Sequence, residues 1–246
     1  MRLTAELINN SLSYLNPLNE RELDLRGHKI PTIENLGVAA KDLEAIDFTD
    51  NDISVLANFP LSPRLQTLLC ARNRIASIQP SLPKSIPNLS TLVLTQNNVS
   101  ELADLDALQG FPKLTHVSLL ENPVTSKENY RYYLLWRNPH IRFLDFQKVK
   151  DAERTRGKEL FGTFDAPTEL AQSIISVRSN RPFSAAPAVN GVGKDQKMKI
   201  TEKERKRFEA LVRNASSLAE VQKLEKMFAE GRLPTDVAGA DEMDET

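Results

Sequence analysis

The sequence has a single cysteine, Cys70, no long apolar run and no excess of charge of either sign. One cysteine excludes an internal disulfide and favours a reducing, intracellular compartment. No stretch approaches the roughly 18 consecutive apolar residues that cross a bilayer, so no membrane partner is expected. The first residues, MRLTAELINNSLSYL, lack the apolar core and cleavage site of a secretory signal. A formal net charge of −1 over 246 residues also argues against a strongly basic nucleic-acid binder.

Residues with catalytic or metal-binding chemistry are sparse as well. The histidines His28, His116 and His140 stand in different segments, with no cysteine or carboxylate at metal-ligand spacing. No serine-nucleophile signature or glycine-rich dinucleotide motif occurs. The stretch GVGK is not a phosphate-binding loop, because Ala188 replaces the required first glycine and Asp195 follows the lysine. We therefore predict a protein that is not an enzyme and has no cofactor or metal.

What the chain has instead is a repeated spacing of apolar residues. Residues 45–56, AIDFTDNDISVL, alternate like a strand, then place an asparagine, then space apolar residues by three. The template recurs at residues 22–33, 67–78 and 91–102, and its first half at 116–127. In the five copies the asparagine position holds His28, Asn51, Asn73, Asn97 and Asn122. These positions are 22 to 25 residues apart, which is the period of the leucine-rich repeat.

Each copy is expected to form one coil of a solenoid. The L-x-L part is a short strand whose alternate side chains point inward, so Cys70 is predicted to be a buried structural thiol. The asparagine side chain is expected to satisfy backbone groups that the following turn leaves unpaired. One coil cannot bury its apolar edge alone, so neighbouring coils must stack.

The predicted fold class is α/β: a leucine-rich-repeat solenoid of about five repeats between two caps. Residues 1–20 form a helical N-terminal cap, residues 20–138 the repeats, and residues 139–164 a C-terminal cap and helix. Thr4 is the expected cap of the first helix. Its expected apolar stripe is Leu7, Ile8, Leu12 and Leu15. In the C-terminal cap the expected inward residues are Tyr130, Leu134 and Leu135 on a helix and Ile141, Leu144 and Phe146 on a strand.

The composition changes after about residue 165. Residues 165–200 are rich in proline and small polar residues and are predicted to be a mostly disordered linker, with a short helix near 168–177. Two capping boxes predict a helical hairpin over 201–234. This hairpin is too small to be secure alone and is expected to need a partner or a surface. Residues 235–246 form an acidic, solvated tail.

The candidate binding surface is the concave face of the strands. It begins acidic at Asp24 and Asp47 and becomes apolar at Leu69 and Val93. Apolar residues held outward on a rigid sheet are typical of a protein-binding groove, whereas a groove for duplex RNA would be lined with Lys and Arg. The alternative is that Leu69 and Val93 are ordinary exposed apolar residues. The predicted partner-binding residues are Asp24, Arg26, Asp47, Thr49, Thr67, Leu69, Ala71, Thr91, Val93, Thr95, His116, Leu120 and Phe143.

A basic cluster follows the predicted C-terminal cap. Lys148, Lys150 and Arg154 are candidate contacts for RNA phosphates. Acidic Asp151 and Glu153 interrupt them, so a solvated helix face is the competing interpretation.

Several segments resemble one family closely. LTAELI, ERELDLRGHKIPTIENLG, AIDFTDNDI, NPVTSKENYR and RFLDFQKVK are similar to the A-prime protein family of the U2 spliceosomal small nuclear ribonucleoprotein. The resemblance covers about residues 1–165 and resumes at NASSLAEVQKLEKMFAEGRLP. The sequence departs from the family at His28, where an aromatic residue is frequent, and in a shorter linker.

The resemblance implies a nuclear protein of pre-mRNA splicing. Family members bind the first RNA-recognition-motif domain of the B-double-prime protein on the concave sheet, and the pair binds a U2 RNA stem-loop. Contacts to RNA bases then belong mainly to the partner, and the C-terminal hairpin is left for other spliceosomal proteins. From the residues alone we expect Leu69, Val93 and Asp47 to contribute most to binding. Two alternatives remain open here: a regulatory subunit of a nuclear phosphatase or chromatin factor, and direct RNA binding without a partner.

Overall fold

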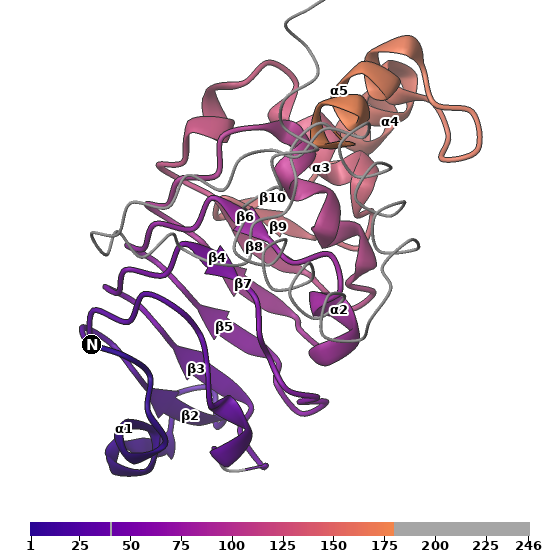
Figure 1. The fold of residues 1–246 in the computed structure, drawn as a ribbon. Helices are drawn as coiled ribbons and strands as arrows, with labels where there is room; N and C mark the ends of the chain where they lie inside the picture. The colour runs from indigo at the N-terminus through magenta and orange to yellow at the C-terminus, as the bar shows by residue number, and fades with distance from the viewer. Residues whose placement is uncertain (40, 180–246) are drawn as a thin grey trace, which may run out of the picture. The chain divides into compact units, whose positions relative to one another are not determined.

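The computed structural model describes residues 1–39 and 41–179 (Figure 1). The predicted hairpin, the acidic tail and the linker beyond residue 179 lie outside these residues. In the described part, eight strands form one sheet in the order β1-β2-β3-β5-β7-β8-β9-β10. They are β1 (Ser13–Leu15), β2 (Arg21–Asp24), β3 (Ala45–Asp47), β5 (Thr67–Leu69), β7 (Thr91–Val93), β8 (His116–Ser118), β9 (Phe143–Leu144) and β10 (Gln147–Lys148).

The strands from β2 to β9 pair in parallel and follow one another in chain order (Figure 1). The inward residues of successive strands stand in register and are buried. They are Leu23, Ile46, Leu68, Leu92, Val117 and Leu144. Each coil therefore buries its apolar edge against the next, which confirms the predicted leucine-rich-repeat solenoid. No helix in the described part is long and apolar enough to cross a membrane.

Short segments return the chain from one strand to the next. They are η1 (Leu36–Val38), β4 (Val55–Leu56), β6 (Ser77–Ile78), α2 (Leu82–Ser85), η2 (Leu102–Gly110) and η3 (Pro123–Ser126). β4 and β6 pair in parallel as a second, two-stranded sheet. The six returning segments differ in backbone conformation. What they share is that each buries apolar side chains in the common core.

A column of buried asparagines joins the coils. The Nδ2 group of Asn97 donates to the carbonyl of Cys70 in the preceding coil at 2.8 Å and to that of Leu94 at 3.0 Å. Its Oδ1 atom accepts a hydrogen bond from the Ile75 backbone N–H at 2.8 Å. The same pattern is made by Asn51, Asn73 and Asn122. The predicted role of the asparagine is confirmed, and the first repeat, which has no repeat before it, holds His28 instead.

The N-terminal cap differs in part from the expectation. Helix α1 spans Ala5–Asn10, and Thr4 caps it by accepting a hydrogen bond from the Leu7 N–H at 3.1 Å. The helix ends before Leu12 and Leu15, which are 71% and 62% exposed, so their predicted place on its apolar stripe is wrong. The chain instead forms β1, which pairs antiparallel with β2 and covers the edge of the sheet.

The C-terminal cap is built from three helices and a hairpin. Helix α3 (Tyr130–Arg137) buries the predicted Tyr130, Leu134 and Leu135. Helices α4 (Asp151–Phe161) and α5 (Glu169–Ser179) follow. Ile141 and Leu144 are buried as expected, but the prediction for Phe146 is wrong: it is 76% exposed. Asp145 and Phe146 form the turn between β9 and β10 and therefore cannot continue the inward alternation.

Helix α5 lies within the first part of the predicted linker. It contains the short helix expected near 168–177. However, Ala171 is fully buried, and Ile174 and Ile175 pack against the core of the repeats. Residues 169–179 are thus an ordered part of the cap, because the solenoid end supplies the apolar surface that an isolated helix lacks.

Close packing of α3 against α4 makes Gly157 sensitive to substitution. A Cβ atom at Gly157 would lie 2.9 Å from the Tyr132 carbonyl oxygen. We expect Gly157→Ala to lower the free energy of unfolding by about 1–3 kcal/mol, because the helices must move apart. Urea denaturation of the full chain measures this change. The exposed neighbour Lys158 is the matched control, and Lys158→Ala should change stability by less than about 0.5 kcal/mol. A gain of stability from Gly157→Ala, as in an open helix, would contradict the expectation.

Candidate functional site

The side chains on the outer side of the parallel strands lie in three rows, which together we call the strand face. Five of them are buried and add little accessible surface: Glu22, Ala45, Asp47, Thr67 and Ser118. The first row of the strand face is Glu22, Ala45, Thr67, Thr91, His116 and Phe143. Its second row is Asp24, Asp47, Leu69, Val93 and Ser118. Its third row, where backbone hydrogen bonds continue past the strands, is Arg26, Thr49, Ala71, Thr95 and Leu120. The structure brings together here all thirteen residues predicted for the concave face; Glu22, Ala45 and Ser118 complete it.

The first coils give the strand face an acidic end with an internal ion pair. The Arg26 guanidinium contacts both carboxylate oxygens of Asp24, at 2.5 and 2.9 Å, and its Nε atom lies 3.6 Å from Asp47 Oδ2. The hydrogen bond from Arg26 holds the pKa of Asp24 below its usual range. The stability from this pair is present above the ordinary pKa of an aspartate and is lost as the pH falls from there through the lowered pKa of Asp24.

The hairpin of β1 and β2 covers part of this end. Buried Glu22 accepts hydrogen bonds from the Tyr14 hydroxyl at 2.9 Å and the Asn16 amide at 3.0 Å. The Thr67 hydroxyl donates to Glu20 at 2.9 Å across the intervening strand. Thr67 and Asp47 are each only 6% exposed. The low exposure of Asp47 leaves it little surface for a partner, which weakens the expectation that it is a principal contact.

The middle of the strand face is apolar. Leu69 and Val93 stand directly in register on β5 and β7, and both are half-buried. Small or short side chains, Ala71 and Thr95, follow them in the third row. A partner can therefore approach closely and cover the two apolar side chains.

The far end of the strand face is aromatic. His116 and Phe143 stand in register on β8 and β9, with ring centroids 4.8 Å apart and planes within 5°. Phe143 is 37% exposed and Leu120 is 38% exposed. The face thus changes along its length from carboxylates through aliphatic to aromatic side chains.

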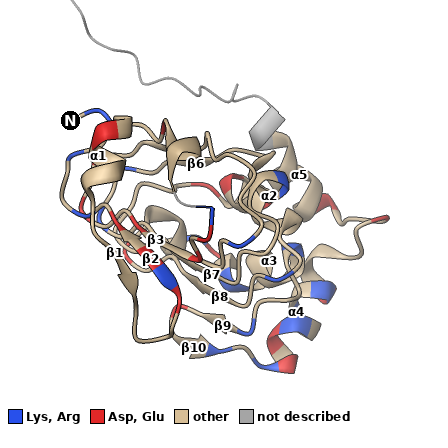
Figure 2. Cartoon of the chain, turned by 90° about the horizontal axis from the view of Figure 1, so that it is seen from below, with Lys and Arg blue, Asp and Glu red and all other residues tan. Residues whose placement is uncertain are grey.

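The three residues predicted to contact RNA phosphates differ in whether their charge is exposed. Lys148 on β10 and Lys150 just before α4 are both exposed. Arg154 instead donates to the carbonyls of Pro139 and Ile141, each at 2.6 Å, so its guanidinium holds the cap together. Figure 2 shows Lys and Arg along α4 and at the end of β10, with acidic residues among them. Of the three predicted contacts, Lys148 and Lys150 are therefore the two whose charge is exposed to a ligand.

In the described part of the chain, the one thiol is buried and no candidate metal centre forms. Cys70 is fully buried, and burial raises the pKa of its thiol, so it is an inert core residue as predicted. Among residues 1–39 and 41–179 there is no group of three or more His, Cys, Asp or Glu side chains that could hold a metal ion.

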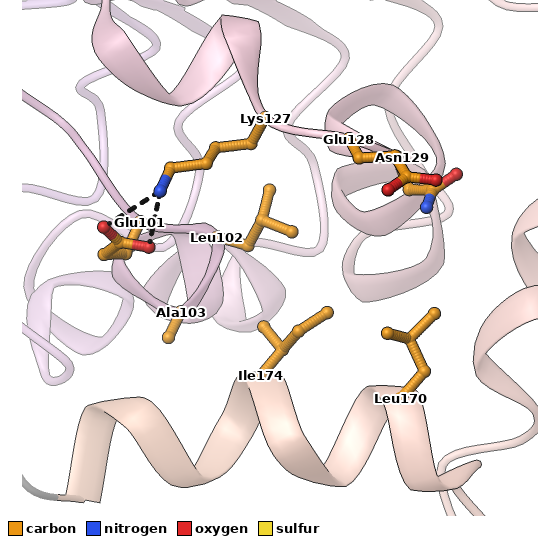
Figure 3. A pocket seen from close by; sticks show the side chains of 8 residues that line it. All are labelled: Glu101, Leu102, Ala103, Lys127, Glu128, Asn129, Leu170 and Ile174. Carbon is orange, nitrogen blue, oxygen red and sulfur yellow. Dashed lines mark hydrogen bonds and ion pairs between the residues drawn. The ribbon is translucent and has the colours of Figure 1, made fainter.

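The structure contains a pocket of about 250 Å³ between η2 and α5 that was not predicted from the sequence (Figure 3). Leu102 and Ala103 of η2 face Leu170 and Ile174 of α5 across it. A Glu101–Lys127 ion pair at 3.2 Å lies on its rim. No residue of the strand face lines it. No motif in the sequence predicts this pocket, because it forms where α5 packs on the repeats.

The in-register strands, the asparagine column and the two caps define a leucine-rich-repeat protein. The leucine-rich repeat family model matches residues 1–175. The chain is 59% identical over 248 residues to U2 small nuclear ribonucleoprotein A' of Neurospora crassa, covering 98% of each. It is 42% identical over 236 residues to that of Homo sapiens, covering 95% of this chain and 90% of the relative.

A solved structure agrees with these relatives. A chain in the crystal structure of the Drosophila melanogaster SNF/U2A' complex matches with a TM-score of 0.66 and 47% identity, over 72% of this chain and 99% of that chain. This chain belongs to the U2 small nuclear ribonucleoprotein A' family, as its sequence motifs indicated. It is therefore a leucine-rich-repeat component of the U2 particle, with a role in splicing.

Proposed function

We propose that the strand face binds a folded protein, the RNA-recognition-motif protein B-double-prime of the U2 particle. The observation that supports this most is the outward Leu69–Val93 pair in the middle of a rigid sheet. An apolar centre with polar and charged surroundings is the usual anatomy of a protein interface. The related chain in the SNF/U2A' complex is itself part of a protein assembly.

The charges of the strand face favour a protein over RNA as its direct ligand. Among the residues of the three rows, Arg26 is the single basic residue of the Lys or Arg type, and its guanidinium forms an ion pair with Asp24. The carboxylates of Asp24 and Asp47 would repel phosphates. In this proposal the chain is a non-catalytic nuclear scaffold, and its partner reads the bases of the U2 RNA stem-loop. No observation favours a phosphatase or chromatin regulator.

Binding of the full chain to two separate ligands tests the proposal. One ligand is the recombinant first RNA-recognition-motif domain of B-double-prime without RNA, and the other is the U2 RNA stem-loop without protein. We expect the chain to bind the protein domain and to bind the RNA alone far more weakly, as measured by calorimetry. RNA bound equally tightly in the absence of the protein domain would contradict the assignment.

Lys148 and Lys150 are proposed to add phosphate contacts in the assembled complex. We expect the double replacement Lys148→Ala with Lys150→Ala to weaken RNA binding by the complex about tenfold and to lower its salt slope by up to about two. Binding of the protein domain alone should not change. The matched control is Lys113→Ala, which removes an exposed lysine that belongs neither to the strand face nor to a helix of the C-terminal cap. An unchanged salt slope in the double variant would show that these ammonium groups do not contact phosphates.

A further inference from the structure

The turn between β9 and β10 holds a residue that its backbone disfavours. Leu144 pairs with Gln147, so the turn consists of Asp145 and Phe146 alone. Their φ angles are 54° and 60°. Positive φ at both central residues is the type I′ pattern, in which Asn-Gly and Asp-Gly are strongly preferred. A bulky aromatic residue at positive φ is uncommon, since its Cβ crowds the backbone.

The side-chain contacts of Asp145 explain why an aspartate stands at the first turn position, but no contact in the described part of the chain explains the phenylalanine at position 146. The Asp145 carboxylate accepts hydrogen bonds from the Leu119 backbone N–H at 2.8 Å and from the Tyr130 hydroxyl at 3.0 Å. Phe146, at 76% exposure, is the most exposed large apolar side chain in the described residues. Neither backbone preference nor core packing therefore accounts for phenylalanine at this position. Conflicts of this kind between local geometry and sequence are concentrated at functional sites.

The turn adjoins the aromatic end of the strand face. The Asp145 backbone N–H donates to Val117, and its side chain holds Leu119, the residue before exposed Leu120. Two residues before Asp145, Phe143 stacks on His116. The hairpin thus adds one exposed apolar side chain, Phe146, beyond the last parallel strand.

We propose that Phe146 is a contact residue for the protein that occupies the strand face, its ring entering an apolar depression of that partner. This inference rests on the proposed function. The carboxylate of Asp145, one residue away, disfavours the phosphates that accompany a nucleobase. Exposed Leu120 and Phe143 beside the turn favour an apolar protein surface.

The variant Phe146→Gly separates binding from stability, because it creates the Asp-Gly pair that this turn prefers. We expect the full-length variant to bind the B-double-prime domain, without RNA, about tenfold or more weakly than the unmodified chain. Its thermal midpoint should be unchanged or higher, since the strain at positive φ is relieved. Phe146→Ala should weaken binding similarly. Leu61→Ala removes an equally exposed apolar side chain from a loop off the strand face and should leave binding unchanged.

Each other outcome overturns the inference. Unchanged protein binding would exclude Phe146 as a contact, and so would a loss confined to RNA binding by the complex, which would point to a nucleobase. A lowered thermal midpoint would indicate a structural role. Leu69→Glu is measured in parallel: if it abolishes binding and Phe146→Gly does not, this inference fails and the proposed function stands. If the unmodified chain does not bind the B-double-prime domain, the proposed function is itself wrong.

Discussion

Replacing Leu69 by glutamate is expected to weaken binding of the B-double-prime domain about 100-fold or more while the solenoid stays folded. Leu69 lies at the centre of the strand face, in register with Asp47 on one side and Val93 on the other. In the Leu69→Glu variant, a bound partner would cover the new carboxylate. That carboxylate would then be buried without a counter-charge and next to the carboxylate of Asp47, which is unfavourable. A 100-fold loss corresponds to about 3 kcal/mol, which is ordinary for a central interface residue. Calorimetry with the protein domain measures it.

The control for the effect of introducing a negative charge at Leu69 is the variant Leu61→Glu. Leu61 is exposed, apolar and outside the strand face, so the same chemical change there should leave affinity nearly unchanged. Circular dichroism should show both variants folded, because Leu69 points outward and is only half-buried. Equal affinity of Leu69→Glu and the unmodified chain would remove the strand face as the binding site.

Replacing Asn97 by alanine is expected to cause the largest loss of stability, about 3–5 kcal/mol. Three buried hydrogen bonds disappear together. The carbonyls of Cys70 and Leu94 and the N–H of Ile75 are then left without this partner in the interior, which costs more than the net value of the bonds. Because Asn97 bridges two coils, the loss acts on the stacking of the solenoid and not on one turn alone.

Urea denaturation of the full chain measures this effect, and the adjacent Asn98 is the matched control. Asn98 is exposed, so Asn98→Ala should change the free energy of unfolding by less than about 0.5 kcal/mol. Similar values for Asn97→Ala and Asn98→Ala would show that the asparagine column adds little to stability. We also expect Asn73→Ala to resemble Asn97→Ala, because Asn73 makes the equivalent bonds to Phe48, Cys70 and Ile53.

The repeat architecture was predictable because its determinants recur locally. Whether Leu92 faces inward depends on strand alternation within one coil, and the role of Asn97 depends on the turn that follows that strand. Parallel stacking of like coils then places equivalent residues side by side. For this reason the sequence also predicted which residues share the strand face, including the adjacency of Leu69 and Val93.

The sequence by itself thus determined the coils, their register and the rows of the outward face, since each follows from short-range periodicity repeated along the chain. The sequence also predicted that helices cover the ends of the solenoid, but the tertiary structure alone decided how they do so. It decided that Leu12 and Leu15 leave the first helix, that Arg154 serves the cap, and that Phe146 is exposed on a turn. These outcomes depend on contacts between segments that follow no repeat, and in such segments no spacing in the sequence specifies which surfaces will meet.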